Sequence, residues 1–348
     1  MNNNIVHLNF AKGFRGGERQ TLLLIQELAL KGYKQEIYTR KNSELAQRLD
    51  GTNNLKITQI SKPYFINLYK VNEATLIHAH ETKGAHFAYF ANILYSIPYI
   101  VTRRVEIPLK NNFFNKNLYR NALYTVVLSR AIEKEVLKLS SKIKTQIIPS
   151  AYSGLQVDTN SADLIRERFS GKFLIGHIGE LKNSDKGQYY LLEAMKRISK
   201  DYPQIDLILL GRGEDEQNFK EQMEGFNNVT FEGFVNNVAD YIATFDLFVF
   251  PSLHEGLGSI LFDVMQAKVP IAASNVGGIP DIIEHNKNGL LYKAKSTNEI
   301  YDAIVKLYKD KDLREGLSNN AYKNIENYSA SSMTDRYEKL YRNQGRTN

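Results

Sequence analysis

Short apolar runs alternate with amphipathic segments along the whole chain. The first apolar run covers residues 5–10, and a pattern of leucines and isoleucines at helical spacing follows over residues 18–31. Runs this short and this apolar are typical of parallel strands that are buried on both faces. The alternation therefore predicts α/β architecture with doubly wound parallel sheets. In the first half the other expected strands are 36–39, 55–60, 75–80, 99–102, 124–128 and 145–148, and the clearest further helices are 82–94 and 131–139.

The periodicity is lost at residues 148–159, which are rich in turn-forming residues, and then it resumes. This interruption predicts a linker between two domains, residues 1–152 and 153–330, with a separate C-terminal helical segment at 331–348. After Gly289 the pattern predicts helices alone. In the second half the expected strands are 173–178, 206–210, 229–231, 247–250 and 271–273, and the expected helices are 188–199, 216–223, 298–308, 313–322 and 332–341.

The most informative stretch is residues 248–278, where a buried strand, a glycine-rich turn and a helix follow one another. Glu255 lies in the turn, and Asp263 lies eight residues later in the predicted helix. Free main-chain N–H groups at the start of such a helix attract phosphate, and two carboxylates can accept hydrogen bonds from sugar and ribose hydroxyls. The alternative is a solvated glutamate beside an aspartate on the helix surface.

Composition narrows the class of protein. The 348 residues are 43% hydrophobic and 24% charged, which is ordinary for a soluble globular protein. Since there is no cysteine, disulfides and thiolate metal sites are excluded, as a reducing cytoplasm would favour. No apolar run approaches the ~20 residues that cross a bilayer, and no signal-peptide pattern is present. No D-x-D motif or His/Cys ligand cluster in the sequence makes a defensible metal site.

The net charge of +7 is unevenly distributed. Residues 1–155 contain 22 Lys and Arg against 10 Asp and Glu, whereas residues 156–348 contain 23 against 28. A basic first half suggests an anionic partner, either a membrane surface, a phosphorylated glycolipid or nucleic acid. A basic surface that only aids solubility is the alternative. Residues 110–120 interleave aromatic and cationic side chains, which is consistent with a membrane-interface patch or with a helix whose aromatic face is buried.

The stretch Pro251-Ser252-x-x-Glu255-Gly256-x-Gly258, followed by Pro270-Ile-Ala-Ala-Ser and Gly277-Gly278-Ile-Pro-Asp, resembles the signature of family-4 glycosyltransferases. These are retaining enzymes of the GT-B fold, in which two Rossmann-like domains face a central cleft. The resemblance implies that the last helix crosses back to pack on the first domain. The family usually has Glu where this chain has Asp263, which keeps the charge and shortens the side chain by one methylene.

The resemblance also implies roles for individual residues of the second domain. Glu255 would hold the hydroxyls of the donor sugar, and Lys186, which resembles the lysine of a G-R-L-x-x-x-K-G motif, would hold the diphosphate. The arginine of that motif is Glu180 here, so Lys182 is expected to supply the missing positive charge. The remaining donor contacts would come from Gly211, from the main chain of Leu257, Gly258 and Ser259, and from Asp263 at the ribose.

In the first domain, Gly16-Gly17 resembles the family loop that lies against the donor phosphate and the acceptor, although a tight turn would need the same residues. His80 matches a histidine that the family often has, but a lone histidine can equally be structural. Arg104 replaces a family histidine that contacts the transferred sugar. Arginine is always charged and cannot act as a general base, but Arg103 and Arg104 together suit a phosphate or carboxylate of the acceptor.

The resemblance implies a retaining glycosyltransferase that uses a UDP-, GDP- or ADP-sugar and needs neither a catalytic metal nor a cofactor. Its acceptor would be a lipid-linked or phosphorylated glycan, such as a lipopolysaccharide core, at the cytoplasmic face of a bacterial membrane. Two rival interpretations remain at this stage. A sugar-nucleotide 2-epimerase would use the same fold without a separate acceptor. A nucleic-acid-binding protein would explain the basic half but would leave the glycines and carboxylates without a role.

Overall fold

The computed structural model describes residues 4–342. The chain forms two compact units, Met1–Ala151 with Asn327–Asn348, and Tyr152–Glu326. The first unit is therefore discontinuous, because its last helix comes from the far end of the sequence.

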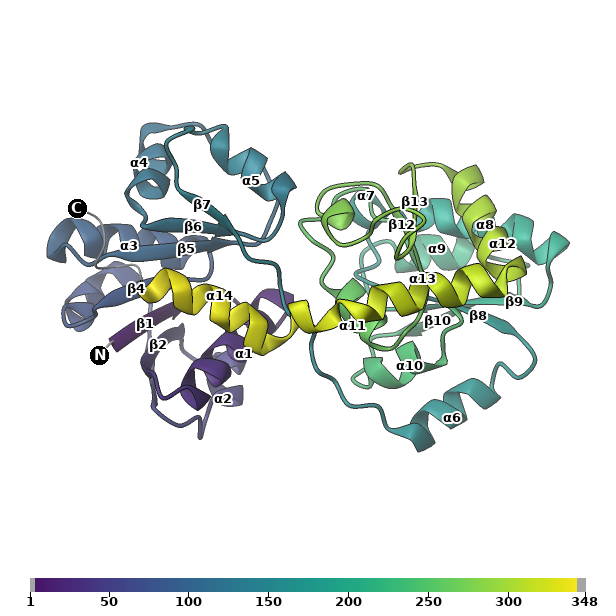
Figure 1. Cartoon of the computed structure of the whole chain (residues 1–348), viewed down its shortest axis with the longest axis horizontal. Coiled ribbons are helices and arrows are strands. Elements are labelled where there is room, and N and C mark those ends of the chain that lie inside the picture. The colour runs from purple at the N-terminus through teal and green to yellow at the C-terminus, as the bar shows by residue number, and fades with distance from the viewer. Residues whose placement is uncertain (1–3, 343–348) are drawn as a thin grey trace. The chain divides into compact units, whose positions relative to one another are not determined.

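The first unit is built on a seven-stranded sheet in the order β3-β2-β1-β4-β5-β6-β7, and every neighbouring pair is parallel. Its central strand, β4, is buried along its whole length because helices cover both faces of the sheet (Figure 1). The strands are β1 (Asn4–Asn9), β2 (Lys34–Arg40), β3 (Leu55–Ile60), β4 (Leu76–Ala79), β5 (Tyr99–Arg103), β6 (Tyr124–Val127) and β7 (Thr145–Ile147).

Side-chain caps set the start of several helices in this unit. Ser129 and Asn112 each accept a hydrogen bond from the main-chain N–H three residues ahead, and Glu81 accepts one each from the N–H groups two and three residues ahead. The C-terminal helix packs on the first helix, where Tyr337 and Leu340 join Leu24 in one apolar cluster. The helices are α1 (Gly16–Leu30), α2 (Glu44–Arg48), η1 (Tyr64–Val71), α3 (Thr82–Tyr95), α4 (Phe113–Asn121), α5 (Arg130–Leu137) and α14 (Ala330–Arg342).

The second unit has a six-stranded parallel sheet in the order β10-β9-β8-β11-β12-β13. The chain builds outward from β8 in one direction and then in the other, so the strand order reverses between β8 and β11. In open α/β sheets, ligands bind outside the carboxyl ends of the strands at such a switch point. The strands are β8 (Phe173–Ile178), β9 (Ile205–Leu210), β10 (Val229–Gly233), β11 (Leu247–Phe250), β12 (Ile271–Ser274) and β13 (Leu290–Tyr292).

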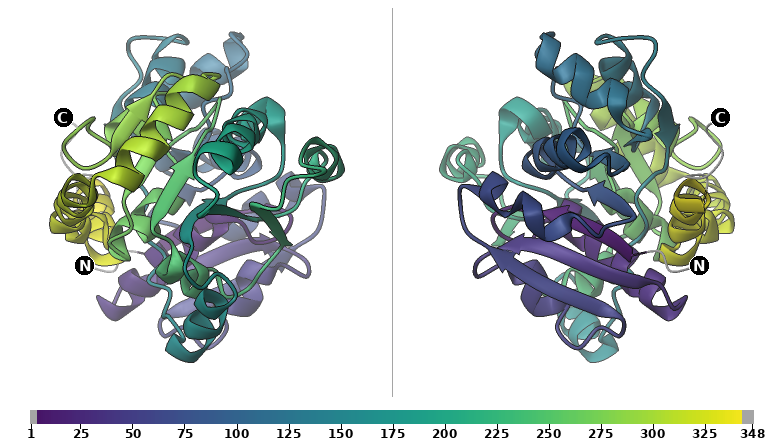
Figure 2. Two further views of the ribbon diagram at one scale, coloured as in Figure 1. Left: turned by 90° about the vertical axis from the view of Figure 1, so that its right-hand side faces the viewer. Right: turned by 90° about the vertical axis from the view of Figure 1, so that its left-hand side faces the viewer.

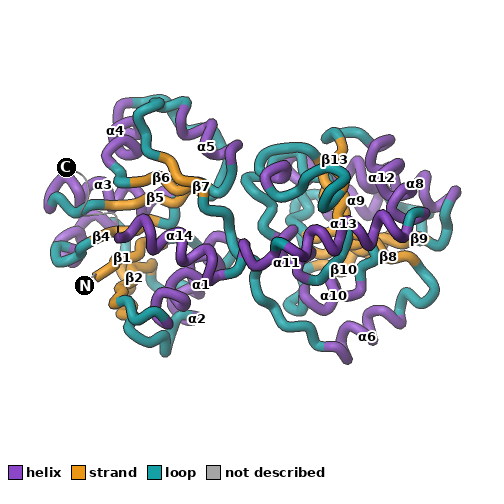
Figure 3. The backbone as a smooth tube through the Cα atoms, viewed as in Figure 1, coloured by secondary structure: helices purple, strands orange, loops and turns teal. Residues whose placement is uncertain are grey.

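Helices lie on both faces of this second sheet (Figures 2 and 3). Within the unit α8 packs against α12, and α6 packs against α10. The helices are α6 (Thr159–Glu167), α7 (Asn183–Lys186), α8 (Gln188–Asp201), α9 (Glu216–Gln222), α10 (Val238–Thr244), α11 (Ile260–Gln266), η2 (Ile279–Asp281), α12 (Thr297–Lys309) and α13 (Lys311–Lys323), and η3 (Ile325–Tyr328) carries the chain into the first unit.

The predicted fold class is confirmed, since both units are doubly wound α/β structures with parallel sheets. One expectation was wrong, because the chain after Gly289 is not purely helical. Residues Leu290–Tyr292 form the edge strand β13, which pairs with β12. Three residues are too few to show a periodicity, and only the pairing partner identifies them as a strand. No helix within residues 4–342 is long and apolar enough to cross a membrane.

Candidate functional site

The loops that follow β8, β9, β11 and β12 are joined by main-chain hydrogen bonds at the carboxyl end of the second sheet. The carbonyl oxygen of Asp185 accepts hydrogen bonds from the N–H groups of Leu253 (2.8 Å) and His254 (3.0 Å). The N–H of Gly278 donates to the carbonyl oxygen of Glu255 at 2.9 Å. Loops far apart in sequence thus form one connected surface around the switch point.

Two glycines allow these loops to approach each other closely. Gly211 has a φ of +130°, and a Cβ built on it would overlap the carbonyl oxygen of Gly179. Gly187 has a φ of +63°, and its Cβ would overlap the carbonyl oxygen of Pro251. Both positions therefore require glycine for conformation and for space. Gly211, expected at the nucleotide, lies at the end of β9 in this loop cluster.

Lys186 and Glu255 form an ion pair across the switch point. The Nζ atom of Lys186 lies 2.6 Å from Oε2 of Glu255, although the two residues are 69 positions apart in the sequence. Their side chains are 23% and 15% exposed. The ammonium also lies 5.8 Å from the centroid of the Phe250 ring. A ligand that reaches this pair meets a cation and a carboxylate at adjacent positions, both still accessible to solvent.

The turn after Glu255 offers main-chain donors beside this pair. Within the described part of the chain, no acceptor takes a hydrogen bond from the N–H of Leu257, Gly258 or Ser259. Gly258 has a φ of +85°, a left-handed conformation that turns the chain into α11. Unpaired N–H groups next to an ammonium favour an anion such as phosphate.

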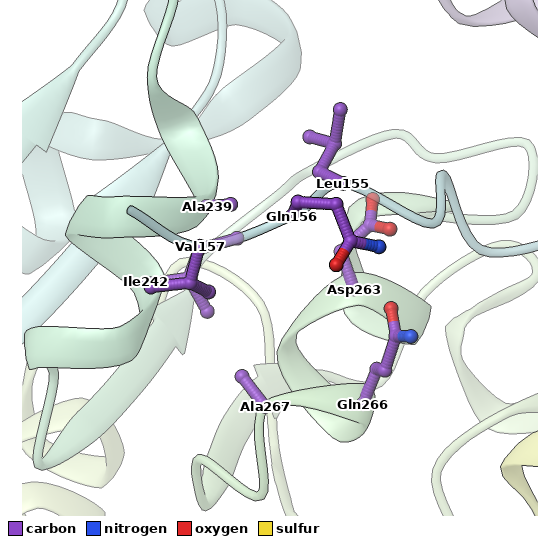
Figure 4. A pocket seen from close by; sticks show the side chains of 8 residues that line it. All are labelled: Leu155, Gln156, Val157, Ala239, Ile242, Asp263, Gln266 and Ala267. Carbon is purple, nitrogen blue, oxygen red and sulfur yellow. The ribbon is translucent and has the colours of Figure 1, made fainter. Parts of the chain in front are cut away.

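Asp263 contacts the inter-domain segment within its own unit. Its two carboxylate oxygens accept hydrogen bonds from Ser153, one from the N–H at 2.5 Å and one from the hydroxyl at 3.0 Å. The side chain points from α11 toward the segment that carries Leu155 and Gln156, beside a pocket of about 350 Å³ (Figure 4). No sequence pattern points to Ser153, because it lies 110 residues from Asp263 in a turn-rich segment without periodicity.

Lys182, expected to replace a missing arginine, lies at the N-cap of α7. Its ammonium is 3.3 Å from Asp185 and 3.8 Å from Glu214. The hydrogen bond to Asp185 raises the pKa of Lys182. Lys182 is thus paired with acidic neighbours. Glu180 is exposed, and its main-chain carbonyl oxygen accepts a hydrogen bond from the side chain of Gln188.

In the first unit, Gly16 and Gly17 are the first residues of α1, directly after the loop that follows β1. Arg104 lies beside them, and a Cβ on Gly17 would be 3.3 Å from Cδ of Arg104. The Nε atom of Arg104 is buried without a hydrogen-bond partner. Burial lowers the pKa of Arg104, while the nearby Tyr337 and Glu18 act in the opposite direction. The structure therefore brings the predicted loop and the predicted arginine together.

His80 belongs to a buried histidine cluster. Its Nε2 lies 3.0 Å from Nδ1 of His7, which also contacts Gln35 through Nε2 at 3.0 Å. His78 lies beside them, with one potential ligand atom of each histidine within 4.8 Å of the others. Burial lowers the pKa of all three, and the charge of Arg104 adds to this for His78 and His80.

Most ring nitrogens of these three histidines have a hydrogen-bond partner within the protein. His78 contacts Tyr341 and Thr102, each at 2.7 Å, so it ties α14 to the sheet. Nδ1 of His80 has no partner. The sequence did not suggest this cluster because His7 lies in a different apolar strand, about 70 residues before His78 and His80.

Arg103, the second residue of the predicted arginine pair, ends β5 and is 7% exposed. Its guanidinium donates to the carbonyl oxygen of Ile107, and its Nε has no hydrogen-bond partner. Both arginines thus present buried donors with unused hydrogen-bonding capacity.

The second unit is similar in sequence to known glycosyltransferases. Residues 159–324 match the family model described as "Glycosyl transferases group 1". The CapM capsular polysaccharide biosynthesis glycosyltransferase of Staphylococcus aureus is 27% identical over 197 residues, which cover 55% of this chain and 51% of that protein. The chain spans about half the length of several curated relatives that it matches.

Solved structures extend the similarity in fold to both units of this chain. A glycosyltransferase from Rickettsia africae has a TM-score of 0.86 at 18% identity, covering 99% of each chain. HepE from Anabaena, solved with UDP and glucose, has a TM-score of 0.81 at 18% identity, covering 97% of this chain and 98% of that one. The structural neighbours are GT-B glycosyltransferases.

Proposed function

We propose that the protein transfers a sugar from a nucleotide diphosphate sugar to the hydroxyl of a separate acceptor. The observation that carries the proposal is the Lys186–Glu255 pair beside the unpaired N–H groups of Leu257, Gly258 and Ser259. Donor binding requires a positive site for the diphosphate and an acceptor of hydrogen bonds for the sugar hydroxyls. Both lie at the switch point of the sheet, within the residues that match the group 1 glycosyl transferase model.

In the proposed complex, Lys186 leaves Glu255 and contacts the diphosphate, while Glu255 accepts hydrogen bonds from the sugar. The acceptor hydroxyl attacks the anomeric carbon on the face from which the diphosphate departs. The bond from that carbon to the phosphate oxygen breaks, and the hydroxyl proton passes to the leaving phosphate, so the anomeric configuration is retained. Positive groups aimed at the departing oxygen stabilise the charge that develops in the transition state. Lys186 and the main-chain donors supply that charge without a metal ion.

A uridine, guanosine or adenosine diphosphate sugar is proposed as the donor. The structural neighbour HepE was solved with UDP and with UDP-glucose, which supports a uridine nucleotide as the first to test. Asp263 is proposed to contact the ribose, in addition to the hydrogen bonds that it accepts from Ser153.

A lipid-linked or phosphorylated glycan is proposed as the acceptor, bound by the first unit at the cytoplasmic side of a membrane. Arg103 and Arg104 support this proposal because each has a buried Nε without a partner. The first unit also exposes large apolar side chains, which an anionic bilayer surface could accommodate together with the basic charge. They are Phe65, Ile66, Tyr69, Phe90, Ile93, Leu94 and Phe113, with exposed fractions from 40% to 84%.

The test is turnover with a panel of UDP-, GDP- and ADP-sugars, each with and without lipid-phosphate glycan acceptors, followed by mass spectrometry. Glycosyl transfer predicts a product whose mass equals that of the acceptor plus the sugar minus one water, with an α-linkage when the donor is α-linked. A new sugar nucleotide formed from the donor alone would instead indicate an epimerase. A product whose anomeric configuration is opposite to that of the donor would contradict the retaining mechanism.

A further inference from the structure

A cavity of about 440 Å³ lies in the first unit, between the segment that follows β5 and the helices α3 and α4. Most of its lining is apolar, including Ala85, Val105, Ile107, Leu109 and Leu118. No aspartate or glutamate is among the residues that line it. The cavity thus combines apolar walls with a complete lack of negative charge.

Arg103 is the buried cation of this cavity, whose lining also includes the polar residues Thr82, His86, Lys110, Asn112 and Asn115, and it has a side-chain hydrogen bond with Tyr119. Its side chain is one of the lining residues and is 7% exposed. Within residues 4–342 it forms no ion pair, and its Nε has no hydrogen-bond partner. A buried guanidinium without a counter-ion is costly unless a ligand supplies one. Phosphate fits this need because arginine binds it through charge-assisted hydrogen bonds.

The surroundings of the cavity are apolar and partly open to solvent. Val105 is 47% exposed and Ile107 is 68% exposed, although both contribute to the lining. Phe113, the first residue of α4, is 84% exposed. Phe114 is held in place, with its ring 5.2 Å from His86 and 5.4 Å from Tyr89. Apolar surface therefore continues from the walls of the cavity to the outside of the unit.

We propose that this cavity binds a phosphate-terminated alkyl or prenyl chain, with the phosphate on Arg103 and the chain along the apolar walls. The inference rests on the proposed function, since this amphiphile would be the lipid end of the acceptor. Lys110, which also lines the cavity, adds a second positive charge for a diphosphate.

The experiment is isothermal titration calorimetry of the full chain with dodecyl phosphate, kept below its critical micelle concentration. Inorganic phosphate and dodecyl maltoside are the comparison ligands, since they carry the anion alone and the chain alone. We expect dodecyl phosphate to bind at least tenfold more tightly than either. Equal affinity for inorganic phosphate, or for dodecyl maltoside, would overturn the proposal.

Two variants test the residues. Arg103→Met removes the guanidinium, and Ile107→Glu places a negative charge at an exposed position of the lining, where it does not disturb the core. Each is expected to weaken dodecyl phosphate binding at least tenfold. Arg120→Met is the matched control, because Arg120 is exposed on α4 and does not line the cavity. Unchanged binding in Ile107→Glu, or equal losses in all three variants, would contradict the assignment.

The titration needs no nucleotide sugar, so its result is independent of catalysis. Binding of dodecyl phosphate without any sugar transfer would overturn the proposed function and leave the lipid-phosphate cavity intact. Sugar transfer without this binding would overturn the cavity assignment alone.

Discussion

Lys186 Nζ and Glu255 Oε2 lie 2.6 Å apart at the point where the strand order of the second sheet reverses. The ammonium and the carboxylate neutralise each other in the ligand-free protein, and both remain partly exposed. A diphosphate sugar offers each of them a new partner of the matching kind, a phosphate for the lysine and hydroxyl groups for the glutamate.

Removal of either member of this pair should reduce catalysis far more than stability. We expect Lys186→Met and Glu255→Gln each to lower kcat/KM by roughly 100-fold or more, as loss of one group that stabilises transition-state charge typically does. The free energy of unfolding should change by only about 1 kcal/mol, because the pair is partly exposed. Steady-state kinetics and urea unfolding measure the two effects.

The exposed ion pair between Lys287 and Glu284 provides the control for this comparison. Lys287→Met should leave both kcat/KM and stability nearly unchanged. Full activity in Lys186→Met or in Glu255→Gln would exclude the proposed donor site.

Metal removal should leave sugar transfer intact. Lys186 and the N–H groups of Leu257, Gly258 and Ser259 are proposed to balance the charge of the leaving diphosphate, so no divalent cation is needed. Turnover measured in excess EDTA should stay within about twofold of turnover in Mg²⁺, since that change is under 0.5 kcal/mol of barrier. A collapse of activity in EDTA that Mg²⁺ or Mn²⁺ restores would refute this account of the leaving group.

The close approach of the loops should make Gly211 sensitive to substitution. Gly211→Ala combines a left-handed φ with overlap against the carbonyl oxygen of Gly179, and we expect a loss of about 3 kcal/mol or more in unfolding free energy. Gly225 has a φ of +81° but open space around its Cβ position. Gly225→Ala should therefore cost only about 1 kcal/mol, the conformational part alone. Equal losses in urea unfolding would show that the loops do not meet as described.

Acidification should weaken the second unit through His177. This residue is buried between Val249 and Gln188, and burial lowers its pKa from 6.5 to about 4, with the charge of Lys186 adding to the effect and the bond to Val249 opposing it. The unfolded chain binds a proton below pH 6.5 that the folded unit takes up only near pH 4. Stability is therefore complete above pH 6.5 and falls by about 3 kcal/mol as the pH drops to 4.

Hydrogen exchange measures this loss of stability. Peptides from β8 and β11 are followed from pH 7 to pH 4, and their rates are corrected for intrinsic exchange. His177→Gln should flatten the pH dependence, because glutamine keeps a donor and an acceptor without titrating in this range. His254→Gln, at an exposed position, should leave it unchanged. An identical slope in the His177 variant would assign the acid sensitivity to other groups.

The sequence predicted most of the fold because buried parallel strands are short, apolar and bounded by turn formers. Phe173–Ile178 and Leu55–Ile60 were predicted with the bounds that the structure has. The strand Leu290–Tyr292 was missed because its three residues carry no period, and its identity depends on pairing with β12. The local sequence pattern identifies a strand when the strand is long. A strand as short as three residues is identified only by its pairing in the folded sheet.

The candidate site was predictable only in part. Glu255 lies in a glycine-rich turn after a buried strand, and Lys186 lies in a stretch that resembles a G-R-L-x-x-x-K-G motif, so each could be selected from the sequence around it. Their mutual contact, like that of Asp263 with Ser153, joins positions far apart in the chain and has no signature in local spacing. The cluster of His7, His78 and His80 was missed for the same reason, since strands β1 and β4 are adjacent only in the folded sheet.

The first unit is formed by two segments that lie far apart in the sequence, and this affects how the protein folds during synthesis. Tyr337 and Tyr341 complete a cluster whose other members, such as Leu24 and Ile100, are translated more than 200 residues earlier. A ribosome-bound chain can finish the second unit while the first still lacks its closing helix. Until α14 emerges, part of the apolar face of the nascent N-terminal sheet stays uncovered, which makes this interval the one in which chaperone protection matters most.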